Sequence, residues 1–256
     1  MRLGFIGTGT ISEALVIGLS TAPGAPTIKV SPRTEAISRR LADRFANVTR
    51  ADSNQAVIDA SDIVMLAMRP AQVEEVLGEL RFDKGQTVIS LVASLGLSAL
   101  AALVPNVRLF RFTPLPMVAE RRGPMLLFPH DVEMSALLSP LGTLIVPQSE
   151  AEFRELGGPS GFMSSYFALQ QALIAGLVDK GIGAGTARLY VRSLMAALGE
   201  TGLAEGGQEG SKLVSEHETP GGINFNTRRV LGAAGWFDKP SSVFAEVAAI
   251  PRNKLT

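Results

Sequence analysis

Met1-Arg-Leu-Gly-Phe-Ile-Gly-Thr-Gly-Thr-Ile-Ser12 joins an apolar strand to a glycine-rich turn, and a helical pattern follows directly. Gly7 permits a tight turn after the strand, Gly9 lets backbone N–H groups approach a pyrophosphate, and the small Ser12 allows the helix to pack against the strand. The positive N-terminal end of that helix would face the phosphates, so that no lysine is required. This order of elements predicts a dinucleotide-binding start to the fold.

The length and composition of the chain limit its organisation and its partners. A chain of 256 residues exceeds the usual size of one domain, and we expect two, at residues 1–150 and 151–256. Hydrophobic residues make up 46% and charged residues 19%, which favours a large core together with a subunit interface. The 24 basic and 24 acidic residues cancel, and the sequence has no basic stripe for nucleic acid or an anionic membrane. We therefore expect small-molecule partners and a homo-oligomer.

Several types of site are excluded by residues that the chain lacks. Without cysteine there can be no disulfide, thiolate zinc site or cysteine nucleophile. Only His130 and His217 are histidines, and neither HxH nor HExxH spacing occurs, so we predict no metal site. The sequence starts as a strand, which leaves no room for a signal peptide, and no apolar run reaches the length of a membrane span. These features predict a cytoplasmic protein.

Apolar or β-branched runs alternate with helical patterns up to about residue 150. This alternation predicts an α/β fold, with a Rossmann-type doubly wound parallel sheet that helices cover on both faces. Beyond the first unit, we expect strands at 27–30, 47–50, 62–68, 87–92, 107–112, 125–128 and 143–146. Helices are expected at 34–45, capped by Thr34, and at 55–60, 73–80, 97–103 and 132–138.

The pattern changes after Glu150, where long helical periodicities replace the strands. Helices are expected at 160–180, 184–205, 210–216, 223–234 and 241–249. Glycine pairs at 157–158, 206–207 and 221–222 separate them. The sequence therefore predicts an all-helical C-terminal domain.

The end of the second strand indicates which dinucleotide is bound. NAD sites carry Asp or Glu there, whereas this chain has Ser31-Pro32-Arg33. A hydroxyl and a guanidinium suit a 2′-phosphate, so NADP(H) is favoured over NAD(H), although Arg33 is alternatively an ordinary solvated loop residue. The fourth strand ends at Ala67, Met68, Arg69 and Pro70, which should lie beside the cofactor because ligands bind beyond the carboxyl ends of such strands.

The most unusual segment of the second half is Glu218-Thr-Pro-Gly-Gly-Ile-Asn-Phe-Asn-Thr227. Pro-Gly-Gly opens a helix there and presents free backbone N–H groups, to which a substrate carboxylate could dock with Asn224 as a further donor. The alternative is a tight turn that caps an ordinary helix. His217, Tyr166 and the hydroxyls of Ser160, Ser164 and Ser165 are weaker candidates, since a lone His or Tyr more often packs or is solvated.

Taken together, these residues resemble the pyrroline-5-carboxylate reductase family over nearly the whole chain. The similarity lies in GFIGTGTISEAL, in Asn54-x-Ala, in LAMRP where the family has LAVKP, in Ser160-Gly161, and in TPGGIN where the family has SPGGTT. The resemblance implies NADP(H)-dependent reduction of a cyclic imine carboxylate and a helical substrate domain that dimerises with its twin. It implies cofactor contacts at Gly7, Thr8, Gly9, Thr10, Ile11, Ser31, Arg33, Asn54, Ala67, Met68, Arg69 and Pro70. Substrate contacts would be Ser160, Gly161, Met163, Pro220, Gly221, Gly222 and Ile223, with Asn224 at the catalytic position.

The departures from the family concern the substrate more than the cofactor. Asn224 replaces a Thr whose hydroxyl contacts the imine, Arg69 replaces a Lys, and Arg111-Phe-Thr-Pro-Leu-Pro116 only loosely matches M-x-N-T-P. Met163 lies where the long helix would begin with Pro-Ala-Tyr. An amide donates a hydrogen bond but does not readily give up a proton, so the proton must come from elsewhere or from water.

Three functions are therefore compared. The first is an NADPH-dependent reductase of a small cyclic imine carboxylate, either pyrroline-5-carboxylate or a related ring. The second is a β-hydroxyacid dehydrogenase, which needs a Lys on the long helix, where only Lys180 at its end is available. The third is an NADP-binding regulator or sensor that has lost catalysis, which would bind cofactor without turnover.

Overall fold

A computed structural model of the protein describes residues 1–207 and 210–249. Residues 208–209 and 250–256, which belong to the expected second domain, lie outside the described residues. The chain divides into an N-terminal unit, Met1–Gly158, and a helical unit that begins at Pro159. The division falls after Gly158 rather than after residue 150, because helix α7 (Glu150–Leu156) packs on the N-terminal unit through its buried Phe153.

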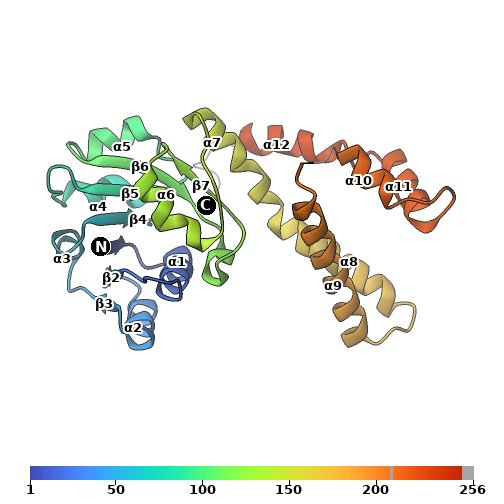
Figure 1. Ribbon diagram of the computed structural model, residues 1–256, viewed down its shortest axis with the longest axis horizontal. Helices are drawn as coiled ribbons and strands as arrows, with labels where there is room; N and C mark the ends of the chain where they lie inside the picture. Colours follow the sequence, from blue (N-terminus) through green and yellow to red (C-terminus); the bar gives the residue numbers. More distant parts are fainter. Residues whose placement is uncertain (208–209, 250–256) are drawn as a thin grey trace. The chain divides into compact units, whose positions relative to one another are not determined.

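One eight-stranded sheet forms the N-terminal unit (Figure 1). Its order is β3-β2-β1-β4-β5-β6-β7-β8. Strands β2 and β3 are added on one side of β1 and the later strands on the other, so the strand order reverses at the boundary between β1 and β4. The strands are β1 (Arg2–Ile6), β2 (Thr27–Val30), β3 (Val48–Arg50), β4 (Ile63–Leu66), β5 (Thr87–Ser90), β6 (Arg108–Thr113), β7 (Pro124–Phe128) and β8 (Thr143–Ile145). The α/β, Rossmann-type expectation is thus confirmed.

The sheet is not wholly parallel, which corrects the expectation from the sequence. Strand β7 runs antiparallel to β6, with Phe112 opposite Leu127. The connection between them, 114–123, contains only a 3-10 turn at Pro116–Glu120. A parallel neighbour needs a longer crossover, usually with a helix, and this connection is too short to provide one.

Helices cover both faces of the sheet, as Figure 1 shows. Alternate residues of a strand point to opposite faces of the sheet, so Leu3 and Phe5 lie in one core cluster and Ile6 lies in the other. The first cluster includes residues of α1 (Thr10–Ser20), α2 (Glu35–Arg44) and α6 (Val132–Leu138). The second includes residues of α3 (Asn54–Asp59), α4 (Val73–Gly78) and α5 (Leu97–Leu103). Helices that pack on both faces of the sheet therefore hold the boundary between β1 and β4 in place.

Thr34 lies at the N-cap position of α2 but does not cap the helix with its side chain. Its backbone is left-handed, with φ of 59°, whereas a capping side chain usually belongs to an extended residue. The expected cap is therefore wrong in its contact, although the helix begins where the sequence predicts.

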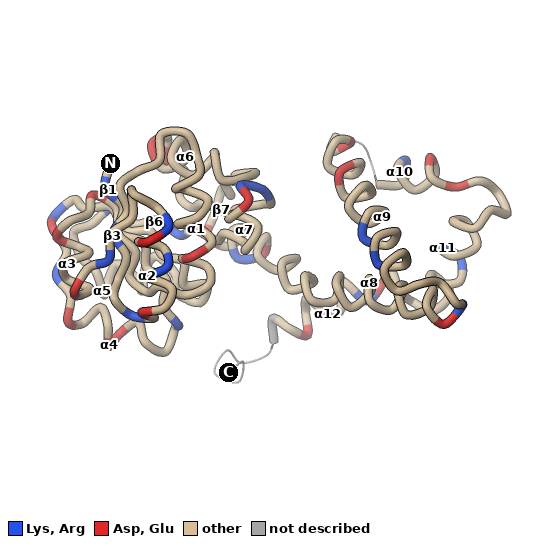
Figure 2. The backbone as a smooth tube through the Cα atoms, turned by 90° about the horizontal axis from the view of Figure 1, so that it is seen from below, with Lys and Arg blue, Asp and Glu red and all other residues tan. Residues whose placement is uncertain are grey.

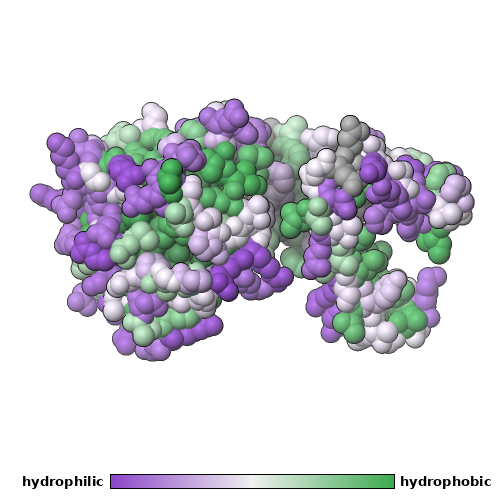
Figure 3. Space-filling view, viewed as in Figure 1, coloured by the Kyte–Doolittle hydropathy of each residue, from purple (hydrophilic) through white to green (hydrophobic). Residues whose placement is uncertain are grey.

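The helical unit is described here by itself. It contains α8 (Met163–Val178), α9 (Ala184–Ala204), α10 (Gly210–Glu216), α11 (Ile223–Ala233) and α12 (Lys239–Ala249), and a 3-10 turn at Gly158–Phe162 leads into α8. Among its described residues, the buried core cluster is small: Ile174, Ala187 and Val191. Many large apolar side chains are exposed instead, and hydrophobic surface is visible on this unit in Figure 3.

One helical stretch, Glu150–Val178, is long and apolar enough to cross a membrane by length and composition alone. Its 29 residues exceed what the sequence led us to expect, because α7, the 3-10 turn and α8 follow one another without a strand. Only 11% of its most apolar window is buried. Like the exposed side chains above, this apolar surface faces solvent here, and such surfaces are typical of interaction sites.

Basic and acidic residues are interspersed along the tube in Figure 2. Many form ion pairs, such as Arg2–Asp62 and Arg108–Asp131. Over the part of the chain that the structure describes, no long run of one sign follows a helix or strand in this view.

Candidate functional site

The glycine turn follows β1 and packs tightly against the end of β4. Gly7 has φ of +93°, and a Cβ at this position would lie 2.2 Å from the carbonyl oxygen of Ala67. Only glycine fits both the conformation and the space. Gly9 is the N-cap of α1, and a Cβ there would meet no atom within 4 Å. The turn is therefore closed on the sheet side and open on the side where a ligand can approach its N–H groups.

Three hydroxyls hold this turn in place. The Gly7 N–H donates to Ser31 Oγ at 3.1 Å, and Thr8 Oγ1 donates to the carbonyl oxygen of Ser31 at 3.0 Å. The Ser12 hydroxyl donates to the Gly7 carbonyl at 2.6 Å. Thr8, Ser12 and Ser31 are all buried, and Ser31 is fully so. The Ser31 hydroxyl thus supports the turn from within the protein, and its direct contact with a cofactor stays a prediction.

A pocket of about 390 Å³ opens beyond the carboxyl ends of β1, β2 and β4. The structure brings most of the expected cofactor residues together there, whereas Thr10, Ile11, Ser31 and Pro70 are not among its lining residues. Two arginines line it, and no carboxylate does. The lining residues are Ile6, Gly7, Thr8, Gly9, Arg33, Thr34, Asn54, Ala67, Met68, Arg69, Gln72 and Val76.

Thr34 and Gln72 are polar lining residues that sequence reasoning missed. Thr34 directly follows Arg33, and Gln72 ends the 3-10 turn Pro70–Gln72 that begins after Arg69. A turn of three residues per repeat returns position 72 to the side of position 69, so the Arg69-Pro70 signal could have identified it. Among the described residues, neither Arg33 nor Arg69 forms an ion pair with a carboxylate. Their charges are available for an anion.

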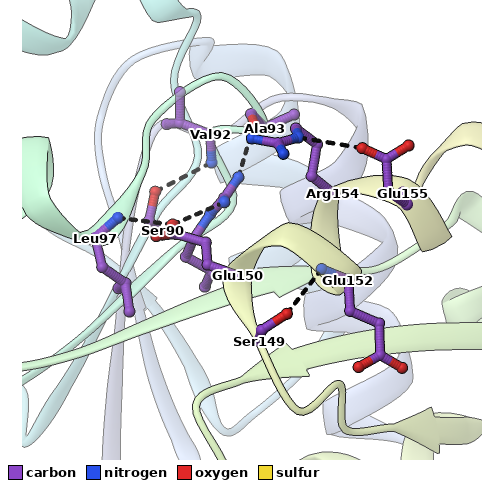
Figure 4. Close-up of polar contacts among 10 residues, drawn as sticks. Ser90, Val92, Ala93, Leu97, Ser149, Glu150, Glu152, Arg154 and Glu155 are labelled. Atoms are coloured by element: carbon purple, nitrogen blue, oxygen red, sulfur yellow. Dashed lines mark hydrogen bonds and ion pairs between the residues drawn. The ribbon is translucent and has the colours of Figure 1, made fainter.

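A partly buried ion pair links α7 to β6, and its arginine also contacts the loop after β5 (Figure 4). Arg111, on β6, contacts Glu150 Oε1 through Nη1 at 2.9 Å and donates from Nη2 to the Ala93 carbonyl at 2.7 Å. The same Glu150 oxygen accepts from the backbone N–H of Leu97 at 2.8 Å. The Arg111 guanidinium also lies 4.6 Å from the centre of the Phe153 ring. These contacts fix the loop beyond β5, which leads into α5.

The Pro220-Gly221-Gly222 turn opens α11, as the sequence predicts. Gly221 has φ of +74°, which requires glycine, and Gly222 is the N-cap residue. The Asn226 amide donates to the Gly221 carbonyl at 2.9 Å and to that of Gly222 at 3.1 Å. Ile223 is 85% exposed. The first N–H groups of this helix are thus presented at the surface of the helical unit, where they can meet an anion.

Asn224 and Glu218 brace the same turn. The Asn224 amide donates to the His217 carbonyl at 2.8 Å. Glu218 pairs with Arg228 through both oxygens, with 2.9 Å between Oε2 and Nη2. The hydrogen bond from Arg228 lowers the pKa of the Glu218 carboxyl. One amide hydrogen of Asn224 is therefore used within the protein, and two contacts link residues before the turn to residues after it.

The other expected substrate residues lie at the start of α8. Ser160 and Gly161 belong to the 3-10 turn Gly158–Phe162, and Met163 is the first residue of α8. The ring of Phe162 packs edge-on against Phe244 of α12, with 5.0 Å between the ring centres. No group of three or more potential metal ligands occurs among the residues that the structure describes.

Known proteins are similar to this chain over both units. A family model described as NADP oxidoreductase, coenzyme F420-dependent, matches residues 2–94. The pyrroline-5-carboxylate reductase of Corynebacterium melassecola is 30% identical over 246 residues, which cover 90% of each chain. That of Pisum sativum is 28% identical over 263 residues, covering 98% of this chain and 94% of its relative.

The fold is shared with solved structures as well. The structure of 1-pyrroline-5-carboxylate reductase from Streptococcus pyogenes covers 96% of both chains with a TM-score of 0.80, at 24% identity. The resemblance seen in the motifs is thus matched by identity along the chain and by the arrangement of its elements. With 30% identity over nine-tenths of both sequences to the corynebacterial relative, this chain belongs to the pyrroline-5-carboxylate reductase family.

Proposed function

We propose that the protein is an NADPH-dependent reductase of the C=N bond of a small cyclic imine carboxylate, pyrroline-5-carboxylate or a close relative. The observation that carries this proposal is the family membership together with a glycine-turn pocket that holds two arginines and no carboxylate. Neither a β-hydroxyacid dehydrogenase nor a sensor has a comparable observation in its favour. Lys180 lies beyond the end of α8, in the turn that leads to α9.

The pocket fits NADP(H) better than NAD(H). A 2′-phosphate needs positive charge and donors, which Arg33 and Arg69 offer, and the end of β2 lacks the carboxylate that would hold a free ribose. The open space at Gly9 and the N-terminus of α1 suit a pyrophosphate. When bound, the cofactor supplies the hydride for the imine carbon. The protein must hold that cofactor, and these residues would do so at its phosphates.

In the helical unit, the N-terminus of α11 would bind the substrate carboxylate through backbone N–H groups that follow Gly222. Asn224 donates one amide hydrogen to the His217 carbonyl, and its amide oxygen can accept a hydrogen bond. We infer that this oxygen orients the imine, because a protonated ring nitrogen donates a hydrogen bond and can no longer accept one. Because an amide does not release a proton, the imine nitrogen takes its proton from water before the hydride arrives, and the protonated imine is then electrophilic enough.

The decisive test is NADPH oxidation, followed by absorbance, with pyrroline-5-carboxylate and a panel of other cyclic imines. NADPH binding is first established by titration. Turnover of pyrroline-5-carboxylate would support the proposal with Asn224 as a tolerated replacement of the family Thr. Turnover of another ring only would keep the reaction and change the substrate. Binding without turnover across the panel would overturn the reductase proposal in favour of a sensor.

Replacing Glu218 by Gln should raise the KM for the imine about three- to tenfold and leave the KM for NADPH unchanged. The reason is that Glu218 and Arg228 hold the residues on either side of the substrate turn, and a neutral amide makes a weaker bond to a guanidinium. The control is Glu216→Gln, which removes an exposed pair with Lys212, 3.5 Å apart on α10. Equal effects of the two variants would contradict a specific role for Glu218.

The lowered pKa of Glu218 sets the pH range of this brace. A carboxyl with a lowered pKa in the folded state stays charged as the pH falls through its unfolded value, which is about 4.3 for Glu. Its contribution is complete above that value and is lost only as the pH falls through the folded pKa. The wild-type KM for the imine should therefore show no step from Glu218 between pH 8 and pH 5.

The exposed apolar surface of the helical unit supports a homodimer. Leu189, Tyr190 and Leu203 on α9 are 71%, 65% and 75% exposed, whereas the buried cluster of this unit holds three residues among those described. Such a surface needs a partner, and a second copy would also cover the apolar stretch that ends at Val178. We infer a cytoplasmic homodimer rather than a membrane protein.

Replacing Tyr190 by Glu should shift the protein from dimer to monomer at micromolar concentration, because a charge would enter the interface. Sedimentation equilibrium measures the mass independently of shape. Val132→Glu is the matched control, since Val132 is 76% exposed on the N-terminal unit and should not affect the mass. A wild-type protein that sediments as a monomer, or that pellets with membranes, would refute the dimer.

A further inference from the structure

We infer that Gln72 is a positioning residue that holds Arg33 over the cofactor pocket and thereby sets the preference for a 2′-phosphate. This inference rests on the proposed NADPH-dependent function. Gln72 follows β4 and Arg33 follows β2, the two strands that flank β1 in the sheet. Their side chains therefore approach each other across the end of β1, above the glycine turn.

The contact between them is direct. The amide end of Gln72 lies 3.2 Å from Nη1 and 2.5 Å from Nη2 of Arg33, and both contacts are hydrogen bonds when the amide is oriented with its oxygen toward the guanidinium. A guanidinium only donates, so the oxygen of the amide must face it. Both residues line the pocket with Gly7, Gly9 and Asn54. Arg33 is an exposed residue in the short loop between β2 and α2, and without this contact its side chain would lose conformational freedom on binding a phosphate.

A neutral acceptor has a particular effect on Arg33. It orients the guanidinium but leaves its full positive charge and its remaining N–H donors for an anion. A carboxylate at position 72 would orient the same group and cancel its charge. Gln72 thus orients Arg33 and leaves the charge of Arg33 intact. A Glu at this position would keep the contact but neutralise that charge, and a Leu would leave the charge but remove the contact.

The surroundings support recognition of an anion at this place. Arg69 supplies a second guanidinium to the pocket. The acidic residue nearest to Arg33 in the sequence is Glu35, in the first turn of α2. Its carboxylate accepts a hydrogen bond from Arg39 at 2.7 Å. Glu35 is also 4.0 Å from Arg50. Its charge is therefore met by other arginines and does not neutralise Arg33.

The test compares dissociation constants for NADPH and NADH, measured by calorimetry on the full chain for wild type, Gln72→Glu and Gln72→Leu. We expect Gln72→Glu to weaken NADPH binding about 30-fold or more, and Gln72→Leu to weaken it about three- to tenfold. NADH binding should change less than about twofold in both. Retained NADH binding shows that a variant is folded, and a purely structural role for Gln72 would weaken both cofactors alike.

The matched control is Ala71→Glu, which adds the same charge one residue earlier. Ala71 lines a separate groove between α4 and α5 with Val73 and Leu95, so the preference for NADPH should stay within about twofold of wild type. The inference is overturned if Gln72→Glu and Gln72→Leu keep the wild-type ratio of the two dissociation constants, or if Ala71→Glu lowers it equally. If wild type itself shows no preference for NADPH, the cofactor proposal fails first.

Discussion

Replacement of Gly7 by Ala is expected to lower the free energy of unfolding by at least about 3 kcal/mol and to abolish measurable NADPH binding. Two causes act together. The residue has φ of +93°, which is strained for any side chain, and the new methyl group would lie 2.2 Å from the Ala67 carbonyl oxygen. Backbone on both sides must then move, and the pocket that these residues line moves with it. Urea unfolding and a cofactor titration measure the two effects.

Gly9→Ala should weaken NADPH binding while leaving the stability of the protein nearly unchanged. Nothing lies within 4 Å of a Cβ at this position and its φ is −101°, so unfolding should change by less than about 1 kcal/mol. The methyl group would nevertheless occupy the approach of the pyrophosphate, and NADPH binding should weaken about 100-fold. If Gly9→Ala binds NADPH as tightly as wild type, the pyrophosphate does not lie on this turn.

Arg111→Met should lower the free energy of unfolding by about 2 to 3 kcal/mol. The Arg111 side chain is 7% exposed, and its loss leaves the Ala93 carbonyl without this donor and the Glu150 carboxylate with the Leu97 N–H but no positive charge beside it. Because Glu150 is 36% exposed, water solvates its carboxylate after the substitution, so the expected loss is smaller than for a fully buried pair. Chemical unfolding of the cofactor-free protein provides the measurement.

Arg122→Met is the control for this variant. Its ion pair with Glu120 is more than half exposed on both sides, so its removal should cost less than about 1 kcal/mol. The double variant Arg111→Met/Glu150→Gln should be more stable than the sum of the single changes, since it removes the unpaired charge. Equal losses for Arg111→Met and Arg122→Met would show that the buried pair contributes nothing specific.

Residues at strand ends were well predicted from the sequence. Gly7, Gly9, Arg33, Asn54 and Arg69 all reach the pocket, because a parallel strand's carboxyl end has a fixed place once the strand order is set. Such positions depend on the backbone, which hydrophobic patterning determines. The expected strands and most helix starts are confirmed for the same reason, as with α5 and α6.

Features that depend on side-chain direction or on distant contacts were not predictable. The Ser31 hydroxyl accepts from the N–H of Gly7, 24 residues earlier, and the pattern around Ser31 gave no sign of this contact. Gln72 was missed because its role depends on Arg33, which belongs to another strand end. The placement of α7 with the N-terminal unit depends on Arg111, 39 residues before Glu150. Contacts of this kind have no local signal in the sequence.

All residues that line the dinucleotide pocket fall between Ile6 and Val76, less than a third of the chain. The candidate substrate turn lies in a separate unit, and its internal braces, Glu218 with Arg228 and Asn224 with His217, are local to it. Mutations can therefore accumulate in one part without disturbing the contacts of the other. A lineage with this construction can exchange one substrate ring for another while its supply of reducing equivalents stays the same.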